Sequence, residues 1–216
     1  MADSPLDVLA RTTGALLATG TRALGATWHR VKPLHPEGAL RRATITRLGG
    51  PIRSGVPWID DDGEDEALVR VSRALGLPES LPDIHGLAIR VEPAGRPADL
   101  LLASTGLGRV TRFVLTAAKR PSGRPLTSLL PYRSPRGPLL VAAAPDSPRT
   151  FDLLWAGPVG PWHRFGRLEL GEAHGDDLQL SFDPVLNQLP GLSQYDWVRR
   201  LREPSYWTAR ERSGRA

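Results

Sequence analysis

The chain has 216 residues, 40% of them hydrophobic, which is enough for one domain with a substantial core and excludes a disordered protein. It contains no cysteine, which excludes disulfides, thiolate metal sites and a cysteine nucleophile. No apolar run reaches the roughly 18 residues that a membrane helix needs, and no basic segment followed by an apolar core marks a signal peptide. We therefore expect a cytoplasmic protein without a transmembrane segment.

The net charge of +5 raises the question of nucleic-acid binding. Nearly all of the basic residues are arginines, and most of them are spread along the chain. One group lies near the end: Arg199, Arg200, Arg202, Arg210, Arg212 and Arg215. Such a group could bind a phosphate backbone, but the solvated face of a helix explains it more simply. The sequence therefore disfavours a nucleic-acid partner.

Both ends of the chain have helical patterns. Residues 1–30 carry leucines at near-helical spacing after Ser4-Pro5, and the glycines among them favour a broken arm that packs on the protein. Residues 194–212 return to a helical pattern, and Pro204 is acceptable in the first turn of a final helix. The pattern does not decide whether the arm packs on its own barrel or on a second copy of the chain. A homo-oligomer is therefore possible.

Eight segments between these ends have the alternation or the apolar runs of β-strands. They are Ala39–Leu48, Ala67–Val71, Leu87–Val91, Leu100–Ala103, Leu139–Ala144, Thr150–Trp155, Arg164–Leu170 and Leu178–Phe182. Residues 109–118 are expected to add a short amphipathic helix or a strand. Many short strands with few helices predict an α+β, mainly β fold: one closed antiparallel barrel domain, residues 1–216, with helical ends.

Several apparent motifs lack the spacing that their chemistry needs. The acidic run Asp60–Glu66 lacks the register of a calcium loop, so we expect a solvated loop there. Gly106-Leu-Gly108 is followed by neither a third glycine nor a distant acidic residue, which argues against a dinucleotide site. His85, His163 and His174 show no metal-ligand spacing, and we expect them at the surface or in loops.

A series of short motifs in the first half of the chain is more informative. His35-Pro-Glu-Gly38 is followed by Val69-Arg70-Val71-Ser72, by Asp83-Ile-His85-Gly86-Leu-Ala-Ile-Arg-Val91 and by Asp99-Leu100-Leu101. In that order they resemble motifs of the haem catalases and their smaller peroxidase-like relatives. The corresponding family motifs are His-x-Lys-Gly, Val-Arg-Phe-Ser, Asp-Pro-Arg-Gly-Phe-Ala-Val-Lys-Phe and Asp-Leu-Val.

The same resemblance continues to the end of the chain. Pro158-Val-Gly-Pro with Gly166-Arg-Leu-Glu-Leu170 is similar to the family's Pro-Val-Gly-Lys-Leu-Val-Leu, and Phe182-Asp183-Pro184 matches its Phe-Asp-Pro signature. Arg202-Glu-Pro-Ser-Tyr206 lies at the spacing from Phe182 that the family's Arg-x-x-x-Tyr has. The likeness spans about Lys32 to Arg210 and implies a catalase-like barrel with haem as cofactor.

The resemblance also implies roles for single residues. His35 would be the distal acid–base, Ser72 would orient it, and Tyr206 would be the axial ligand of the haem iron. Arg70 would neutralise a haem propionate, and Arg202 would favour the charged phenolate.

Ser104 stands where the family has its distal asparagine and would be a shorter donor to peroxide. The chain also lacks the helical insertions of true catalases. We therefore expect a peroxidase-type reaction with hydrogen peroxide or an organic hydroperoxide. The alternative is a haem-free barrel that serves as a binding or scaffolding module.

The same residues also have purely structural interpretations. His35 could cap a strand end, and Tyr206 could pack a C-terminal helix against the barrel. A guanidinium in an apolar strand needs an anionic partner, so Arg70 could pair with Asp83 or Asp99 instead of a propionate.

Overall fold

The computed structural model describes residues 37–78, 80–174 and 180–199, all within the unit that spans residues 35–216. The expected helical arm at residues 1–30, His35, and the part of the expected C-terminal helix beyond residue 199 lie outside the described residues. Residues 196–199 are helical, as expected for the start of that helix. In the described part of the chain, no helix is long and apolar enough to cross a membrane.

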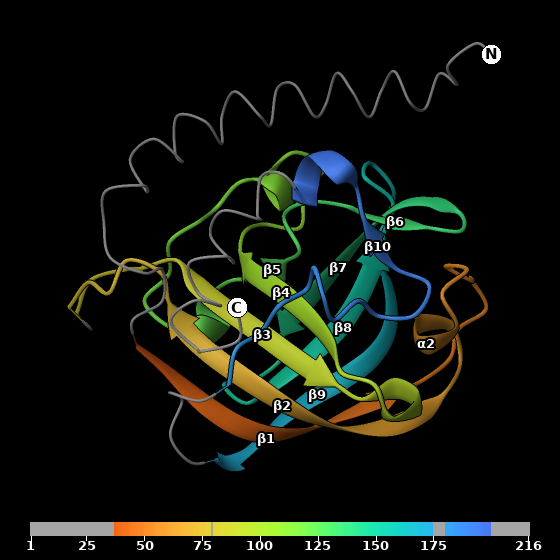
Figure 1. The fold of residues 1–216 in the computed structure, drawn as a ribbon. Helices are drawn as coiled ribbons and strands as arrows, with labels where there is room; N and C mark the ends of the chain where they lie inside the picture. The colour runs from red at the N-terminus through yellow and green to blue at the C-terminus, as the bar shows by residue number, and fades with distance from the viewer. Residues whose placement is uncertain (1–36, 79, 175–179, 200–216) are drawn as a thin grey trace. The chain divides into compact units, whose positions relative to one another are not determined.

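Eight antiparallel strands of the described chain close into a barrel, which confirms the predicted fold class (Figure 1). They are β1 (Glu37–Arg47), β2 (Gly63–Arg73), β3 (His85–Val91), β4 (Ala98–Ser104), β5 (Leu126–Thr127), β7 (Gly137–Pro145), β8 (Thr150–Ala156) and β9 (His163–Ala173). β8 pairs with both β7 and β9, and β9 pairs with β1, so the sheet has no open edge at this point. Closure satisfies the backbone groups that an edge strand would leave exposed.

The remaining elements are short. β6 (Tyr132–Ser134) and β10 (Ser193–Gln194) extend the sheet from β7. α2 (Pro57–Asp60) begins at a proline, which a first helical turn tolerates. Three 3-10 helices follow, η1 (Pro93–Gly95), η2 (Thr111–Phe113) and η3 (Pro121–Gly123).

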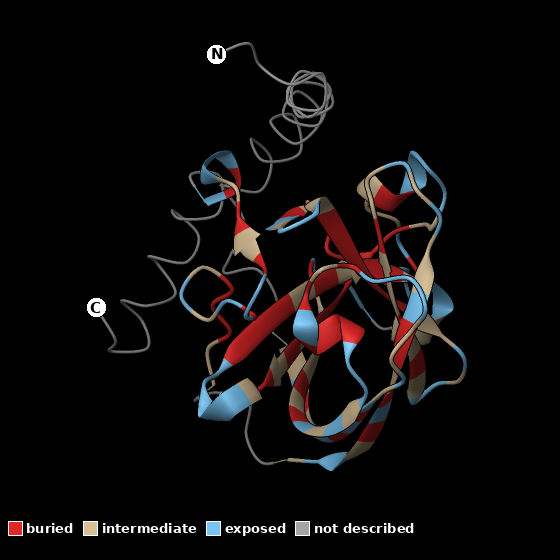
Figure 2. Cartoon of the chain, turned by 90° about the vertical axis from the view of Figure 1, so that its right-hand side faces the viewer, coloured by how far each residue is buried: buried red, intermediate tan, exposed pale blue. Residues whose placement is uncertain are grey.

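Alternate residues of several barrel strands face the core, and Figure 2 shows this as a change of colour along them. Ile45, Val69, Ile89 and Leu100 are at most 2% exposed and belong to one hydrophobic cluster with Phe165. The predicted strands between residues 39 and 170 therefore coincide with observed ones, because one face of each is buried.

Three local predictions were wrong. The acidic run was expected to be a loop, but its residues 63–66 begin β2, where Glu64 and Glu66 face solvent and Asp65 accepts from Arg47 Nε at 2.7 Å. Residues 109–118 form a loop with only η2 in it. Residues 180–182, the described part of the expected Leu178–Phe182 strand, are not a strand.

Candidate functional site

The outer face of β1–β4 carries a row of small side chains. Four residues lie opposite one another on neighbouring strands: Gly38, Ser72, Gly86 and Ala103. Their sequence neighbours Val71, Leu87 and Leu102 belong to or pack against the core, so the row itself faces outward. We call it the small-residue row, since none of its four residues has a long side chain of its own.

Ser72 occupies the middle of the small-residue row. Its two cross-strand neighbours are glycines, Gly38 on β1 and Gly86 on β3. The serine is 7% exposed, so its hydroxyl lies in a sheltered position on the outer face.

Arg70 lies in the next row and reaches back to Gly38. A Cβ atom added at Gly38 would come within 2.6 Å of Arg70 Cζ and 2.7 Å of its Nε, so the guanidinium occupies the room that this glycine leaves. The two carboxylates proposed as its structural partners are engaged by other arginines, Asp83 by Arg73 and Asp99 by Arg90. The guanidinium is therefore positioned beside Ser72 on the outer face.

Ser104 is not brought together with Ser72. It follows Ala103 directly, so its side chain points to the opposite side of the barrel wall. Its hydroxyl accepts from the His85 N–H at 3.0 Å and donates to Thr116 O at 2.7 Å. Through these two hydrogen bonds, Ser104 on β4 connects β3 to the loop that follows β4.

The other predicted site residues, His35, Arg202 and Tyr206, lie outside the described residues. The described chain nevertheless fixes where the segment that leads to Tyr206 starts. Residues 180–187 lie on the outer face of β3 and β4, the face that also carries Ser72 and Arg70.

Asp99 anchors this segment. Arg90 Nε and Nη2 donate to the two Asp99 oxygens at 2.7 Å each, in a bidentate pair. Asp99 Oδ2 also accepts from the Asp183 N–H and from Asn187 Nδ2, both at 2.7 Å. Arg90 in turn lies over the Phe182 ring, 5.1 Å from its centroid. Two motifs that are 84 positions apart in the sequence are thus joined by one buried carboxylate.

His85, expected at the surface or in a loop, is instead buried in β3 at 2% exposure. Its Nε2 lies 2.9 Å from Ala118 O, and because a carbonyl can only accept, the ring carries its proton on Nε2. Nδ1 is buried without a hydrogen-bond partner among the described residues. Burial lowers the pKa of His85, with a smaller effect from the nearby Arg73 charge, so the neutral ring is favoured.

Asp83 is fully buried beside this histidine. Burial alone would raise its pKa, but the N–H groups of Leu75, Leu77 and Ile84, with Arg73, outweigh burial and hold the pKa below its ordinary value. The carboxylate thereby shapes the β2–β3 loop.

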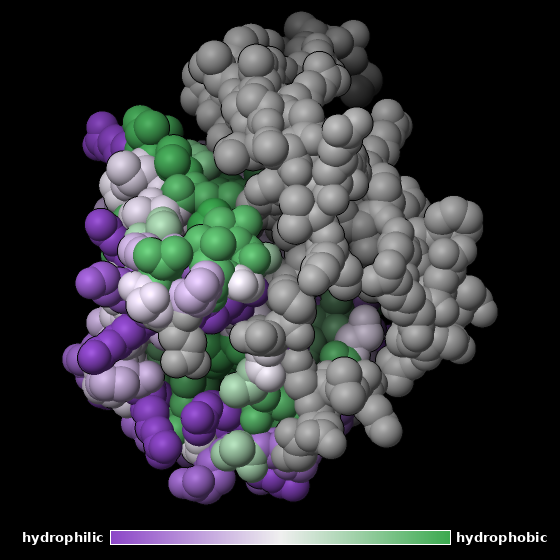
Figure 3. Space-filling view, turned by 90° about the vertical axis from the view of Figure 1, so that its left-hand side faces the viewer, coloured by the Kyte–Doolittle hydropathy of each residue, from purple (hydrophilic) through white to green (hydrophobic). Residues whose placement is uncertain are grey.

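That loop exposes the leucines Leu75, Leu77 and Leu81, which are 38–49% exposed. Figure 3 views the molecule from the side on which the loop lies in Figure 1 and shows hydrophobic side chains gathered among hydrophilic ones. An exposed hydrophobic area of this kind is typical of a contact surface.

No sequence pattern indicated the role of Arg112, which joins two loops. It is 2% exposed, and its guanidinium donates to Leu107 O, Gly108 O and Gly157 O at 2.9–3.2 Å. It also lies over the Trp162 ring, 4.7 Å from the centroid. Burial, with a smaller effect from the nearby Arg109 charge, lowers its pKa, yet the carbonyl oxygens stabilise the cation.

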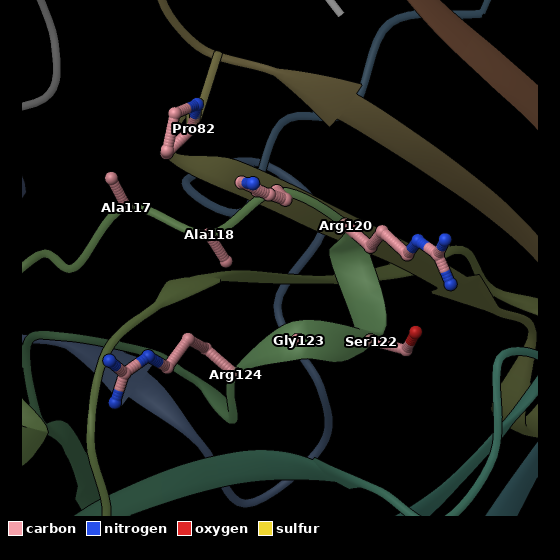
Figure 4. Close-up of a pocket in the computed structure, with 8 residues that line it drawn as sticks. Pro82, Ala117, Ala118, Arg120, Ser122, Gly123 and Arg124 are labelled. Atoms are coloured by element: carbon pink, nitrogen blue, oxygen red, sulfur yellow. The ribbon is translucent and has the colours of Figure 1, made fainter. Parts of the chain in front are cut away.

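A second feature that was not predicted is an open hollow beside Ala118, lined by Lys119, Arg120, Ser122, Gly123 and Arg124 (Figure 4). These residues come from η3 and the chain on both sides of it. The hollow shares no residue with the small-residue row, since its lining comes from the loop after β4 and from Pro82 in the β2–β3 loop.

No protein-family model matches the chain, and no curated protein matches it. Among solved structures, the chain is similar to a fungal catalase, with a TM-score of 0.65 and 12% identity over 90% of this chain and 62% of the catalase. It is also similar to catalase A from Saccharomyces cerevisiae, with a TM-score of 0.58 and 12% identity over 88% of this chain and 63% of that enzyme. The fold is therefore catalase-like, and the chain spans less than two thirds of the length of these two catalases.

Proposed function

We propose that this protein is a small catalase-like haem protein that reacts with hydrogen peroxide or an organic hydroperoxide in a peroxidase-type reaction. One observation carries the proposal. The Val-Arg-Val-Ser strand and the Phe-Asp-Pro segment, each similar to a catalase motif, lie on the same outer face of β1–β4. Motifs that are far apart in sequence would have no reason to share a face if their likeness to catalases were accidental.

The described residues fit one side of a haem site. The four residues of the small-residue row have no long side chain of their own, and the Arg70 guanidinium lies over the Gly38 end of the row. A guanidinium at the margin of a flat apolar group suits a haem propionate. In this proposal Tyr206 would hold the haem iron through its phenolate oxygen, and Arg202 would keep that phenolate charged.

When bound, haem would supply the redox centre for peroxide reduction, and a reducing co-substrate would supply the two electrons that each turnover consumes. The residues of the chain supply proton transfer and orientation. His35 takes the proton from one peroxide oxygen and returns it to the other as the O–O bond breaks. Ser72 orients the His35 ring by a hydrogen bond to one of its nitrogens.

A second candidate, a haem-free barrel that binds or scaffolds other molecules, is favoured by two observations. The residues of β4 on the outer face are Asp99, Leu101 and Ala103, so this strand offers no amide or hydroxyl donor next to Ser72. The β2–β3 loop also exposes the hydrophobic area around Leu77. Such a protein would use its surface for binding and would have no peroxide activity.

Peroxide turnover of the hemin-loaded protein tests the proposal. His35→Ala should reduce turnover by about 100-fold or more, because general acid–base catalysis contributes at least that much. His174→Ala is the matched control, since its Nδ1 contacts only the exposed Arg42 Nε at 3.2 Å among the described residues. The proposed mechanism is refuted by an unchanged His35→Ala rate or by equal losses in both variants.

A further inference from the structure

The hollow beside η3 is a basic feature of the described surface. It has a volume of about 500 Å³ and is open to solvent. Lys119, Arg120 and Arg124 line it within six consecutive positions, and none of the described residues that line it is acidic. Pro82 also lines the hollow, and Asp83, which follows it, is fully buried and engaged by three backbone N–H groups and Arg73.

The charges of this hollow are not neutralised within the described chain. Lys119, Arg120 and Arg124 are all exposed, and none of their side chains forms an ion pair or a hydrogen bond with a described residue. The hydroxyl of Ser122 likewise has no hydrogen-bond partner among the described residues. Most other arginines of the described barrel do have a partner, as Arg90 and Arg47 have in Asp99 and Asp65.

The wall of the hollow is rigid although its side chains are exposed. Asp83 and Ala118 exchange two backbone hydrogen bonds, of 3.0 and 2.9 Å, and His85 Nε2 donates to Ala118 O at 2.9 Å. Pro125 O accepts from the Thr105 N–H at 2.8 Å, which fixes the other end of the segment. A ligand that binds here would therefore order side chains only and not the backbone.

From this we infer that the hollow binds a phosphate-bearing small molecule. Guanidinium groups match the oxygens of phosphate by paired N–H donors, and Lys119 adds a third positive charge. In Figure 4 the Arg120 and Arg124 side chains extend in opposite directions from η3, so a ligand needs more than one phosphate group to approach both guanidinium groups. A compact ligand fits better than nucleic acid, because the unpaired charges gather in one hollow and do not follow a groove.

Titration calorimetry with inorganic pyrophosphate and inorganic phosphate tests this site. Pyrophosphate should bind more tightly than phosphate. The double variant Arg120→Gln/Arg124→Gln should weaken pyrophosphate binding by about fivefold or more. The matched control is Arg96→Gln/Arg109→Gln, which removes the same net charge from exposed arginines that do not line the hollow. The control should change binding by less than about twofold, because distant surface charges are screened.

Gly123→Val tests the shape of the site without a change of charge. A Cβ atom at Gly123 would lie 3.3 Å from Ala118 Cβ, inside the hollow, so the valine should weaken pyrophosphate binding. The inference is overturned if pyrophosphate does not bind or if both double variants weaken it equally. Binding of single-stranded DNA that both double variants weaken equally would also overturn it, because that result indicates a diffuse basic surface. All these outcomes are independent of haem.

Discussion

Replacement of Asp99 by alanine should cost the barrel a large part of its stability. The carboxylate is 1% exposed and accepts four hydrogen bonds of 2.7 Å, two of them from Arg90. Its removal leaves the guanidinium of Arg90, 11% exposed, without its carboxylate. Breaking one partner of a buried pair costs about 3–5 kcal/mol, because the remaining charge is buried and uncompensated. The Asp183 N–H and the Asn187 amide also lose their acceptor.

Urea unfolding followed by tryptophan fluorescence measures this loss, and hydrogen exchange locates it. We expect Asp99→Ala to lower the free energy of unfolding by about 3–5 kcal/mol and to speed exchange at the Asp183 amide. The control is Asp61→Ala, which removes an exposed pair with Arg53 at 2.8 Å and should cost less than about 1 kcal/mol. A loss below about 1 kcal/mol for Asp99→Ala would refute the role of this carboxylate as the anchor.

Three further predictions concern single side chains. Arg112→Met should lower the free energy of unfolding by about 2–4 kcal/mol, because it removes the three hydrogen bonds from the guanidinium to loop carbonyl oxygens. A change below about 0.5 kcal/mol in thermal melts would contradict this prediction. The pKa of His85 is lower in the folded protein than in the unfolded chain, so the unfolded chain takes up a proton at a higher pH. The free energy of unfolding should therefore fall as the pH drops below about 6.5. His85→Gln keeps a donor to Ala118 O but does not titrate, so its stability should fall less between neutral and mildly acidic pH; parallel curves would argue against a role for this histidine. Gly38→Ala puts a methyl group where the Arg70 guanidinium lies, so the affinity for hemin should fall. The free energy of unfolding should change by less than about 1 kcal/mol. An unchanged affinity for hemin would argue against Arg70 as a propionate partner.

The barrel strands could be predicted because one face of each is buried and the sequence alternates accordingly. The first residues of β2 could not be predicted as a strand, because they contain no apolar residue. Glu64 and Glu66 face solvent, and Asp65 pairs with Arg47. The loop at residues 109–118 looked amphipathic, but Arg112 holds it through bonds to distant carbonyl oxygens. No local pattern encodes such bonds.

Part of the site could have been predicted better from alternation alone. His85 has the parity of Leu87, Ile89 and Val91, which marks it as a residue of the core face. Ser104 has the parity of the buried Leu102, so it had to face away from Ala103 and the small-residue row. Motif likeness gives a position in the sequence, but the pleat of the strand decides which side of the wall the side chain reaches.

The absorption spectrum of the purified protein during titration with hemin tests the central proposal most directly. A haem site with Tyr206 as axial ligand predicts a Soret band that saturates at one hemin per chain and changes in Tyr206→Phe. Tyr195→Phe is the control, because the Arg133 guanidinium would keep its place over the ring, 5.0 Å from the centroid. A titration without a saturable Soret band would contradict the haem proposal and favour the haem-free barrel.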